Sequence, residues 1–144
     1  MKKYDARMHS AEHILNQTMD RMFSCGRCFS AHIEKKKSKC DYRFERHLSQ
    51  AEITAIQKQV NKIIAEDLAV TESYIAKTEA EENFNTEKLP MDVDDRIRIV
   101  SIGDYDACPC IGPHVQSTGQ IGEFRITSAS FEKGVLRIRF KLAG

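Results

Sequence analysis

Two pairs of metal-ligating side chains, one near each end of the chain, constrain the fold more than any other feature. Residues 9–13 have the sequence His-Ser-Ala-Glu-His, and residues 110–114 have the sequence Cys-Ile-Gly-Pro-His. On a helix, side chains four residues apart lie on one face, so the two histidines of 9–13 point the same way. The Gly-Pro step in 110–114 favours a tight turn. A fold that brings both pairs together can bind one cation.

Sulfur and nitrogen donors favour Zn²⁺ over calcium or magnesium, which prefer oxygen. The predicted ligands are His9, His13, Cys110 and His114. Each pair alone also has an ordinary explanation, namely solvated histidines on a polar helix face and a cysteine buried as a small hydrophobic residue. The five cysteines are an odd number in a chain without a signal peptide, which favours reduced thiols or metal ligands over disulfides.

A protease interpretation uses the same helix. His9-x-x-Glu12-His13 fits the H-x-x-E-H pattern of inverted zinc proteases, in which Glu12 would be the general base. Those enzymes need a further acidic ligand from a second helix and a substrate cleft, usually in a much longer chain. Cys110 and His114 are therefore the better partners for the helix histidines.

The chain length of 144 residues is enough for one domain with a real core, which we place at 1–144. No apolar run approaches the roughly 20 residues that span a bilayer, and no secretory signal is present, so a cytoplasmic protein without membrane contact is expected. The net charge of +1 gives no global positive field. RNA contact must therefore come from local patches or from a partner protein.

Hydrophobic periodicity predicts helices over 5–23 and from Ser49 to about 67. Asp5 is the expected N-cap of the first helix and Gly26 its end, and Ser49 with Glu52 forms a capping box for the second. A second box, Thr78 with Glu81, predicts a short helix that ends near residue 84.

Alternating or β-branched runs predict strands over 28–34, 40–46, 70–76, 96–102, 123–131 and 135–142. Residues 35–39, 89–92 and 103–122 are expected to be turns or loops, and Lys133-Gly134 should form a hairpin turn. The mixed order of elements indicates an α+β fold, with a mainly antiparallel sheet packed with two longer helices.

Three segments carry a resemblance to a known family. Residues 8–15, Met-His-Ser-Ala-Glu-His-Ile-Leu, are similar to its H-[ST]-A-x-H-[LI]-L helix, and residues 98–105, Arg-Ile-Val-Ser-Ile-Gly-Asp-Tyr, to its R-V-V-S-I-G-D-F strand. Residues 110–115 and 117–122 resemble C-G-G-T-H-V followed by x-T-G-E-I-G. The chain thus resembles, from about Met8 to Leu142, the editing domain shared by alanyl- and threonyl-tRNA synthetases and by freestanding AlaX-type trans-editing proteins.

The resemblance implies a freestanding, zinc-dependent aminoacyl-tRNA deacylase that acts in trans on mischarged tRNA, with seryl-tRNA(Ala) as the favoured substrate. Ile111 and Pro113 depart from the Gly and Thr usual in the alanyl branch, and Gly-Pro-His-Val is closer to the threonyl branch. The identity of the removed amino acid is therefore open. The alternative is a non-catalytic RNA- or synthetase-binding module in which zinc only holds the helix and the loop together.

Several further residues receive predicted roles. Glu12 would orient water or act as a base, against the alternative of an exposed helix carboxylate. The residues expected in the substrate pocket are Ser10, Ile111, Thr118 and Gly119. The candidates for RNA binding are the lysines at 35–37 and 39 and one face of the last strand, namely Arg137, Arg139 and Lys141; solvated surface is the alternative for both. Cys25 and Cys28 are interpreted as incidental thiols at a helix end, and a homo-oligomer is compatible with the sequence.

Overall fold

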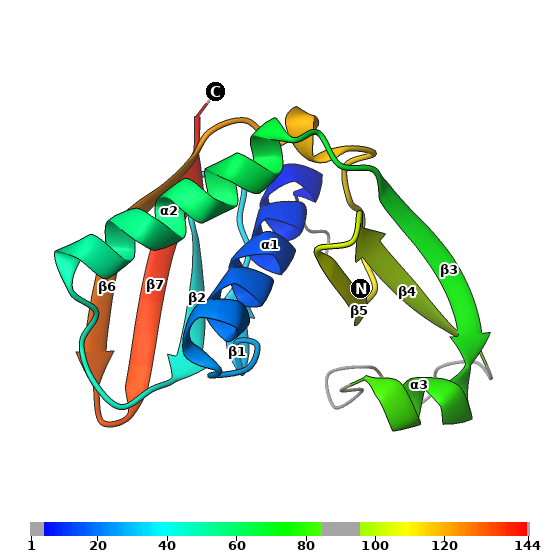
Figure 1. Cartoon of the computed structure of the whole chain (residues 1–144), viewed down its shortest axis with the longest axis horizontal. Coiled ribbons are helices and arrows are strands. Elements are labelled where there is room, and N and C mark those ends of the chain that lie inside the picture. Colours follow the sequence, from blue (N-terminus) through cyan, green and yellow to red (C-terminus); the bar gives the residue numbers. More distant parts are fainter. Residues whose placement is uncertain (1–4, 85–95, 144) are drawn as a thin grey trace.

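Antiparallel strands form two separate sheets, and two long helices cover one face of the larger sheet (Figure 1). The computed structural model describes residues 5–84 and 96–143, so the predicted loop at 89–92 lies outside the described residues. The helices are α1 (Ala6–Phe23), α2 (Gln50–Ala65) and α3 (Lys77–Asn83). The strands are β1 (Ser30–His32), β2 (Ser38–Arg43), β3 (Val70–Ala76), β4 (Arg96–Ile102), β5 (Asp106–Pro109), β6 (Phe124–Glu132) and β7 (Val135–Leu142).

The two sheets divide the molecule into two lobes. The larger lobe consists of α1, α2 and the sheet with strand order β1-β2-β7-β6, and the smaller lobe consists of α3 and the sheet β3-β4-β5. All strand neighbours in both sheets are antiparallel. The predicted α+β class with two longer helices is confirmed, but the strands form two sheets where one was expected.

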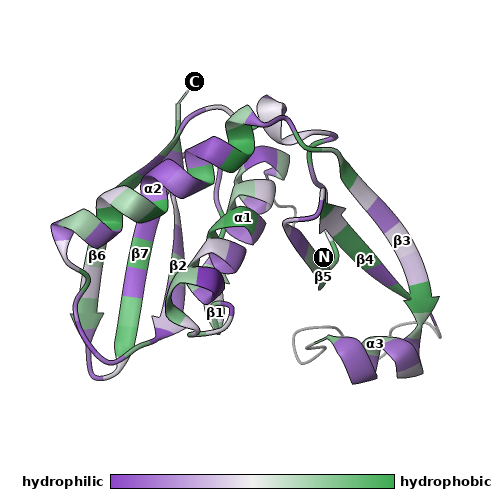
Figure 2. Ribbon diagram, viewed as in Figure 1, coloured by the Kyte–Doolittle hydropathy of each residue, from purple (hydrophilic) through white to green (hydrophobic). Residues whose placement is uncertain are grey.

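The larger lobe contains most of the buried apolar surface. Buried apolar residues of α1 and α2 pack with those of the sheet in one cluster, and the hydropathy colouring shows hydrophobic and hydrophilic residues alternating along both helices (Figure 2). Its largest fully buried side chains include Leu15, Met19, Ile56, Tyr42, Phe124, Leu136, Ile138 and Phe140. A separate small cluster in the other lobe consists of Ala80, Ile97 and Ile99. Burial of apolar area therefore stabilises the larger lobe far more than the smaller one.

Local hydrogen bonds set the ends of the two long helices. Asp5 accepts a hydrogen bond from the main-chain N–H of Met8 at 3.0 Å, as an N-cap should. The predicted end at Gly26 is wrong, because Ser24 already takes a left-handed conformation with φ 54° and donates its N–H to Asp20. At the start of α2, Ser49 and Glu52 form the predicted capping box.

Three other local predictions are corrected. The helix α3 begins at Lys77 with Ala76 as a cap that has no side-chain hydrogen bond, so the expected Thr78–Glu81 box is absent. The strand β1 is shorter than 28–34, and β2 runs over 38–43 where 40–46 was expected. The predicted loop 103–122 contains β5 and a 3₁₀ turn, Thr118–Gln120.

The hairpin between β6 and β7 forms as predicted. Lys133 and Gly134 both have positive φ, at 50° and 81°, which is the backbone of a two-residue type I′ turn. None of the described helices has the length and apolar content that crossing a membrane requires.

Candidate metal centre

The first turns of α1 carry two of the predicted ligands into the interior. His9 and His13 are each only 3% exposed. Their rings meet edge to face, with centroids 5.0 Å apart. The four-residue spacing on the helix is what places both imidazoles at one point.

The other two predicted ligands come from the segment that follows β5. The main-chain N–H of Cys110 donates to the carbonyl of Arg98 at 3.3 Å and so extends the pairing with β4. Gly112 then takes φ 105°, a conformation that favours glycine. The chain turns back after it, and Cys110 Sγ lies 3.2 Å from His114 Nε2.

The two pairs meet between the lobes. His114 stacks on His9 with ring centroids 4.0 Å apart and meets His13 edge to face at 4.5 Å. One donor atom from each of four side chains lies within 4.8 Å of the others, and these are His9, His13, Cys110 and His114. Ligand atoms on a tetrahedral zinc, with bonds of about 2.0–2.3 Å, are roughly 3.3–3.8 Å apart. Small side-chain shifts would therefore place all four on one ion, and the donor set fits zinc.

Hydrogen bonds to the outer ring nitrogens orient two of the histidines. His9 Nδ1 donates to the carbonyl oxygen of Pro113 at 3.0 Å. Since a carbonyl only accepts, the neutral ring carries its lone pair on Nε2. Ser10 Oγ lies 2.9 Å from His114 Nδ1 and accepts the N–H of Val115 at 3.1 Å. Ser10, expected in the substrate pocket, is fully buried and positions His114.

An ionised carboxylate lies behind the third histidine. His13 Nδ1 is buried, lies 3.6 Å from Asp106 Oδ2, and has no hydrogen-bond partner among residues 5–84 and 96–143. Arg27 donates to both oxygens of Asp106, at 2.7 and 3.3 Å, and Gln17 donates at 2.9 Å. Burial acts to raise the pKa of Asp106, but His13 and Arg27 lower it to about 2. A carboxylate behind a histidine is a common outer partner of metal ligands.

Neither Asp106 nor Arg27 was predicted from the sequence. Asp106 stands four residues before Cys110, so proximity to a ligand motif was the one signal that could have found it. Arg27 gave no signal, because it comes from the loop after α1 and meets Asp106 only in the folded chain.

The ionisation of the site favours cation binding near neutral pH. Burial and the neighbouring His13 lower the pKa of His9 to about 4, and burial with the nearby histidines lowers that of His114 to about 2. Both rings are therefore neutral at pH 7. Burial and Cys108 raise the pKa of Cys110 to about 12. A bound cation would displace the thiol proton, so its affinity should fall in acid.

Glu12 lies against the site, and the alternative of an exposed helix carboxylate is wrong. Its side chain is 13% exposed, and its Oε1 lies 3.9 Å from His9 Nε2. Its Oε2 accepts from Asn16 Nδ2 at 3.4 Å. No acidic residue of α2 joins the four ligands in the described part of the chain, which counts against the protease interpretation.

The remaining predicted pocket residues lie in different surroundings. Ile111 is 43% exposed and adjoins Cys110. Thr118 is buried, and its hydroxyl accepts from Leu68 N at 2.9 Å. Gly119 donates its N–H to Asp67 at 2.9 Å. The last two residues thus hold the 3₁₀ turn against the end of α2.

A cavity of about 140 Å³ adjoins His114 and was not predicted. It is also lined by Val70, Thr71, Glu72, Arg98, Val100, Val115 and Gln116. Arg98 spans its wall, donating to Glu72 at 2.8 Å and to the carbonyl of Gly112 at 2.9 Å. The cavity therefore offers a charged pair and three valines next to a predicted ligand.

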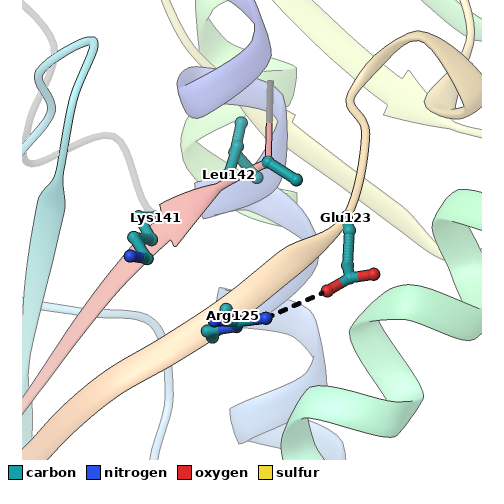
Figure 3. Close-up of a pocket in the computed structure, with 5 residues that line it drawn as sticks. Glu123, Arg125, Lys141 and Leu142 are labelled. Atoms are coloured by element: carbon teal, nitrogen blue, oxygen red, sulfur yellow. Dashed lines mark ion pairs between the residues drawn. The ribbon is translucent and has the colours of Figure 1, made fainter.

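The three cationic residues proposed for RNA lie on the outer face of the larger sheet. Arg137 donates to both oxygens of Asp41, which stands opposite it on β2, and Arg139 stands opposite Lys39. Lys141 helps to line a pocket of about 300 Å³ at the end of this face (Figure 3). Arg137 is thus charge-paired, whereas no ion pair joins Arg139 or Lys141 to an acidic group among residues 5–84 and 96–143.

Comparison with known proteins gives a matching family and relatives among the alanine–tRNA ligases. Residues 97–139 match the family described as the threonyl and alanyl tRNA synthetase second additional domain. Over 93% of its length, the chain is 34% identical to the alanine–tRNA ligase of Aeropyrum pernix and 30% identical to that of Methanopyrus kandleri. The alanine–tRNA ligase of Cenarchaeum symbiosum is also 34% identical over 93% of the chain.

These findings confirm the resemblance to the synthetase editing domain that the sequence motifs indicate. The matched family segment contains all of β4 except Arg96, together with β5 and the two predicted ligands Cys110 and His114. The chain spans about 15% of the length of these alanine–tRNA ligases.

Proposed function

We propose that this relative of the alanine–tRNA ligases is a zinc-dependent hydrolase that removes wrongly attached amino acids from tRNA. It would act in trans as a single domain over 1–144, in the cytoplasm, where charged tRNA is used. The bond cleaved is the ester between the amino acid and the terminal ribose, and seryl-tRNA(Ala) is the favoured substrate. The observation that carries the proposal is the convergence of four zinc-type donors in a chain related to tRNA synthetases.

The four converging side chains, His9, His13, Cys110 and His114, would hold the ion. A zinc ion with an open position polarises a carbonyl or lowers the pKa of bound water toward ~7. Because four protein ligands fill a tetrahedral site, catalysis requires one of them to bind loosely. His114 is the candidate, since it adjoins the 140 Å³ cavity through which a substrate could displace it.

Glu12 would act on the attacking water. Its Oε1 lies on the ligand side of α1, 3.9 Å from His9 Nε2. A carboxylate held there by Asn16 can orient a water molecule and accept its proton, which typically contributes 10²–10⁴-fold to a rate. Ser10 would keep the His114 ring in place and would not contact the substrate itself.

The substrate would lie between Ile111 and the cavity beside His114. The exposure of Ile111 next to Cys110 supports a direct contact. Thr118 and Gly119 would shape the region indirectly, through their bonds to the end of α2. The volume of about 140 Å³ suits a small amino acid, in keeping with serine.

The tRNA backbone would contact the outer face of the larger sheet through Arg139 and Lys141, with Arg137 beside them. Such contacts neutralise phosphates, so binding should weaken with salt and show little dependence on sequence. Mischarged tRNA is then the only partner that the proposed activity requires.

A specific observation favours the alternative of a zinc-stapled, non-catalytic module. All four donor atoms come from the protein and lie within 4.8 Å of one another, and closed four-ligand sites are usually structural. In that case zinc would join the lobes and the chain would bind tRNA or a synthetase without cleaving the ester.

A deacylation assay distinguishes the hydrolase from the non-catalytic module. The purified chain is mixed with seryl-tRNA(Ala) and with alanyl-tRNA(Ala), with and without a chelator. We expect release of serine only, lost on chelation and in the Cys110→Ala variant while the circular dichroism spectrum is kept. Unchanged seryl-tRNA, together with a chelator-induced loss of structure, would support the structural alternative.

A panel of other mischarged tRNAs, including mischarged tRNA(Thr), then identifies the amino acid that is removed. Ile111→Gly combined with Pro113→Thr restores the residues usual in the alanyl branch. If these positions set specificity, the double variant should shift the preferred amino acid while binding the same amount of zinc.

A further inference from the structure

A second group of metal-type donors lies next to the first. Glu12, Cys28 and Cys40 each offer one ligand atom within 4.8 Å of the other two. They come from α1, from the loop before β1 and from β2. Cys28 is 2% exposed and Cys40 is fully buried. We call these three residues the thiol cluster.

Asn16 holds the thiol cluster in place. Its side-chain amide donates to Glu12 Oε2 at 3.4 Å, and its carbonyl oxygen accepts the N–H of Cys28 at 3.1 Å. The hydroxyl of Tyr42, two residues after Cys40, donates to the same oxygen at 2.7 Å. One buried side chain therefore ties together the three segments that supply the donors.

Cys28 makes its contacts away from Cys25, although the two thiols are only three residues apart in the sequence. The thiol of Cys25 faces the carbonyl of Met19 at 3.7 Å, whereas the thiol of Cys28 faces Glu12 Oε2 at 3.5 Å and lies within 4.8 Å of Cys40 Sγ. The interpretation of Cys28 as an incidental thiol at a helix end therefore misses the contacts that it makes.

The chemistry of the thiol cluster suits a thiophilic divalent cation. Two sulfurs and one carboxylate oxygen can bind zinc, with water in the fourth position, and two sulfurs disfavour calcium and magnesium. Burying the ionised carboxylate of Glu12 beside two buried thiols costs free energy. A cation bound there would compensate the negative charge. Burial acts to lower the pKa of the Arg27 guanidinium, but nearby acidic groups raise it overall, and Glu12 is one of them. Arg27 therefore lies close to Glu12.

We propose that Glu12, Cys28 and Cys40 form a second metal site, for zinc or a similarly thiophilic divalent cation, adjacent to the first. Glu12 lies between the two sites, because its Oε1 lies 3.9 Å from His9 Nε2 and its Oε2 faces Cys28. Binding releases two thiol protons to solvent and involves no redox change. The site goes beyond the proposed hydrolase and holds whether or not the first ion is catalytic.

Cobalt substitution tests the proposal without reference to activity. The full-length chain is stripped of metal, kept under reductant and titrated with Co²⁺, which gives an ultraviolet thiolate-to-metal band for each thiolate bound. We expect two Co²⁺ per chain. Cys110→Ala, which removes the first site's thiolate, should keep about two thirds of the band, because two of three thiolates remain.

Variants of the thiol cluster give the converse result. Cys40→Ala and Cys28→Ser should each reduce the stoichiometry to one Co²⁺ and keep only the band from Cys110. The matched control is Cys25→Ala, which changes a nearby thiol outside both groups and should keep two ions. Circular dichroism of each variant shows whether it folds, and Cys28→Ser keeps the size of the side chain in case Cys40→Ala does not.

Three results would overturn the proposal. One is a single Co²⁺ per chain whose band vanishes in Cys110→Ala. The second is two ions that persist in Cys28→Ser and Cys40→Ala. The third is a Cys28–Cys40 disulfide, found by mass spectrometry in protein purified and held under reductant, since the thiolates would then be unable to bind a cation.

Discussion

The two lobes are built from similar strands but differ in what holds them. The larger lobe packs two helices on a four-stranded sheet around fully buried aromatic and aliphatic side chains. The smaller lobe has a three-stranded sheet, one short helix and a cluster of Ala80, Ile97 and Ile99. The larger lobe supplies His9 and His13, and the segment after β5 supplies Cys110 and His114. An ion bound by all four would therefore tie the weakly packed lobe to the strongly packed one.

The largest effect should come from the core of the larger lobe. Phe140 is fully buried, and its ring lies 5.1 Å from that of Phe124. Phe140→Ala should lower the free energy of unfolding by about 3–5 kcal/mol, measured by urea denaturation. The half-exposed Phe29 is the control, and Phe29→Ala should cost much less. Equal losses in the two variants would contradict the assignment of stability to this core.

A smaller and more local effect is expected in the other lobe. Ile97 is 3% exposed within the small cluster, and Ile97→Ala should cost about 2–4 kcal/mol. Because Ile97 packs in the small cluster, whereas β4 reaches the larger core at its other end through Ile102, hydrogen exchange should accelerate most around Ile97 in β3 and β4 while β7 stays protected. Tyr74→Ala, at an exposed position on β3, is the control. Uniform acceleration in both lobes would mean that they unfold as one unit.

The next prediction concerns the affinity of the metal centre between the two lobes. Asp106→Asn keeps the size of the side chain but removes the charge behind His13. Loss of such an outer partner typically lowers metal affinity 10–100-fold, about 1.4–2.8 kcal/mol, measurable by competition with a zinc chelator. Asp104→Asn, at an exposed position in the turn just before β5, should leave the affinity unchanged. An unchanged affinity in Asp106→Asn would remove this carboxylate from the metal centre.

The smallest effect concerns pH in the metal-free protein. Burial and His13 lower the pKa of His9 from 6.5 to about 4. Between these values the unfolded chain binds more protons than the folded one, so stability should fall as pH drops from about 6.5 toward 4. Between pH 6.5 and about 5.5 the loss through His9 should be about 1 kcal/mol, and it should be smaller in His9→Gln. A pH profile of thermal denaturation that is the same in both proteins would contradict the burial of His9.

Much of the fold could be predicted where local chemistry decides it. Asp5, the Ser49–Glu52 box and the Lys133-Gly134 turn act within a few residues, and each forms as expected. The division into two sheets could not be predicted, because strand pairing depends on distant segments. The strand β5 was missed because it has four residues, ends in a proline and lies inside a long loop.

In the candidate site too, contacts set by spacing in the sequence could be predicted, whereas contacts between distant segments could not. The spacing of the histidines and of Cys110 with His114 was enough to name the four residues that meet. The contact of Arg27 with Asp106 and that of Cys28 with Cys40 arise only when α1, β2 and β5 pack together. Helical position alone also gave the wrong surroundings for Glu12, because α1 is covered on the side where that residue lies.

The inner strand β7 is the last of the described elements, and it pairs with β2 on one side and β6 on the other. During synthesis, the helix that carries His9 and His13 leaves the ribosome about a hundred residues before Cys110 and His114 do. The nascent chain therefore cannot close the cation site until late, and its main sheet later still. We therefore expect metal loading at this site to begin only after residue 114 has been synthesised, when all four predicted ligands are available.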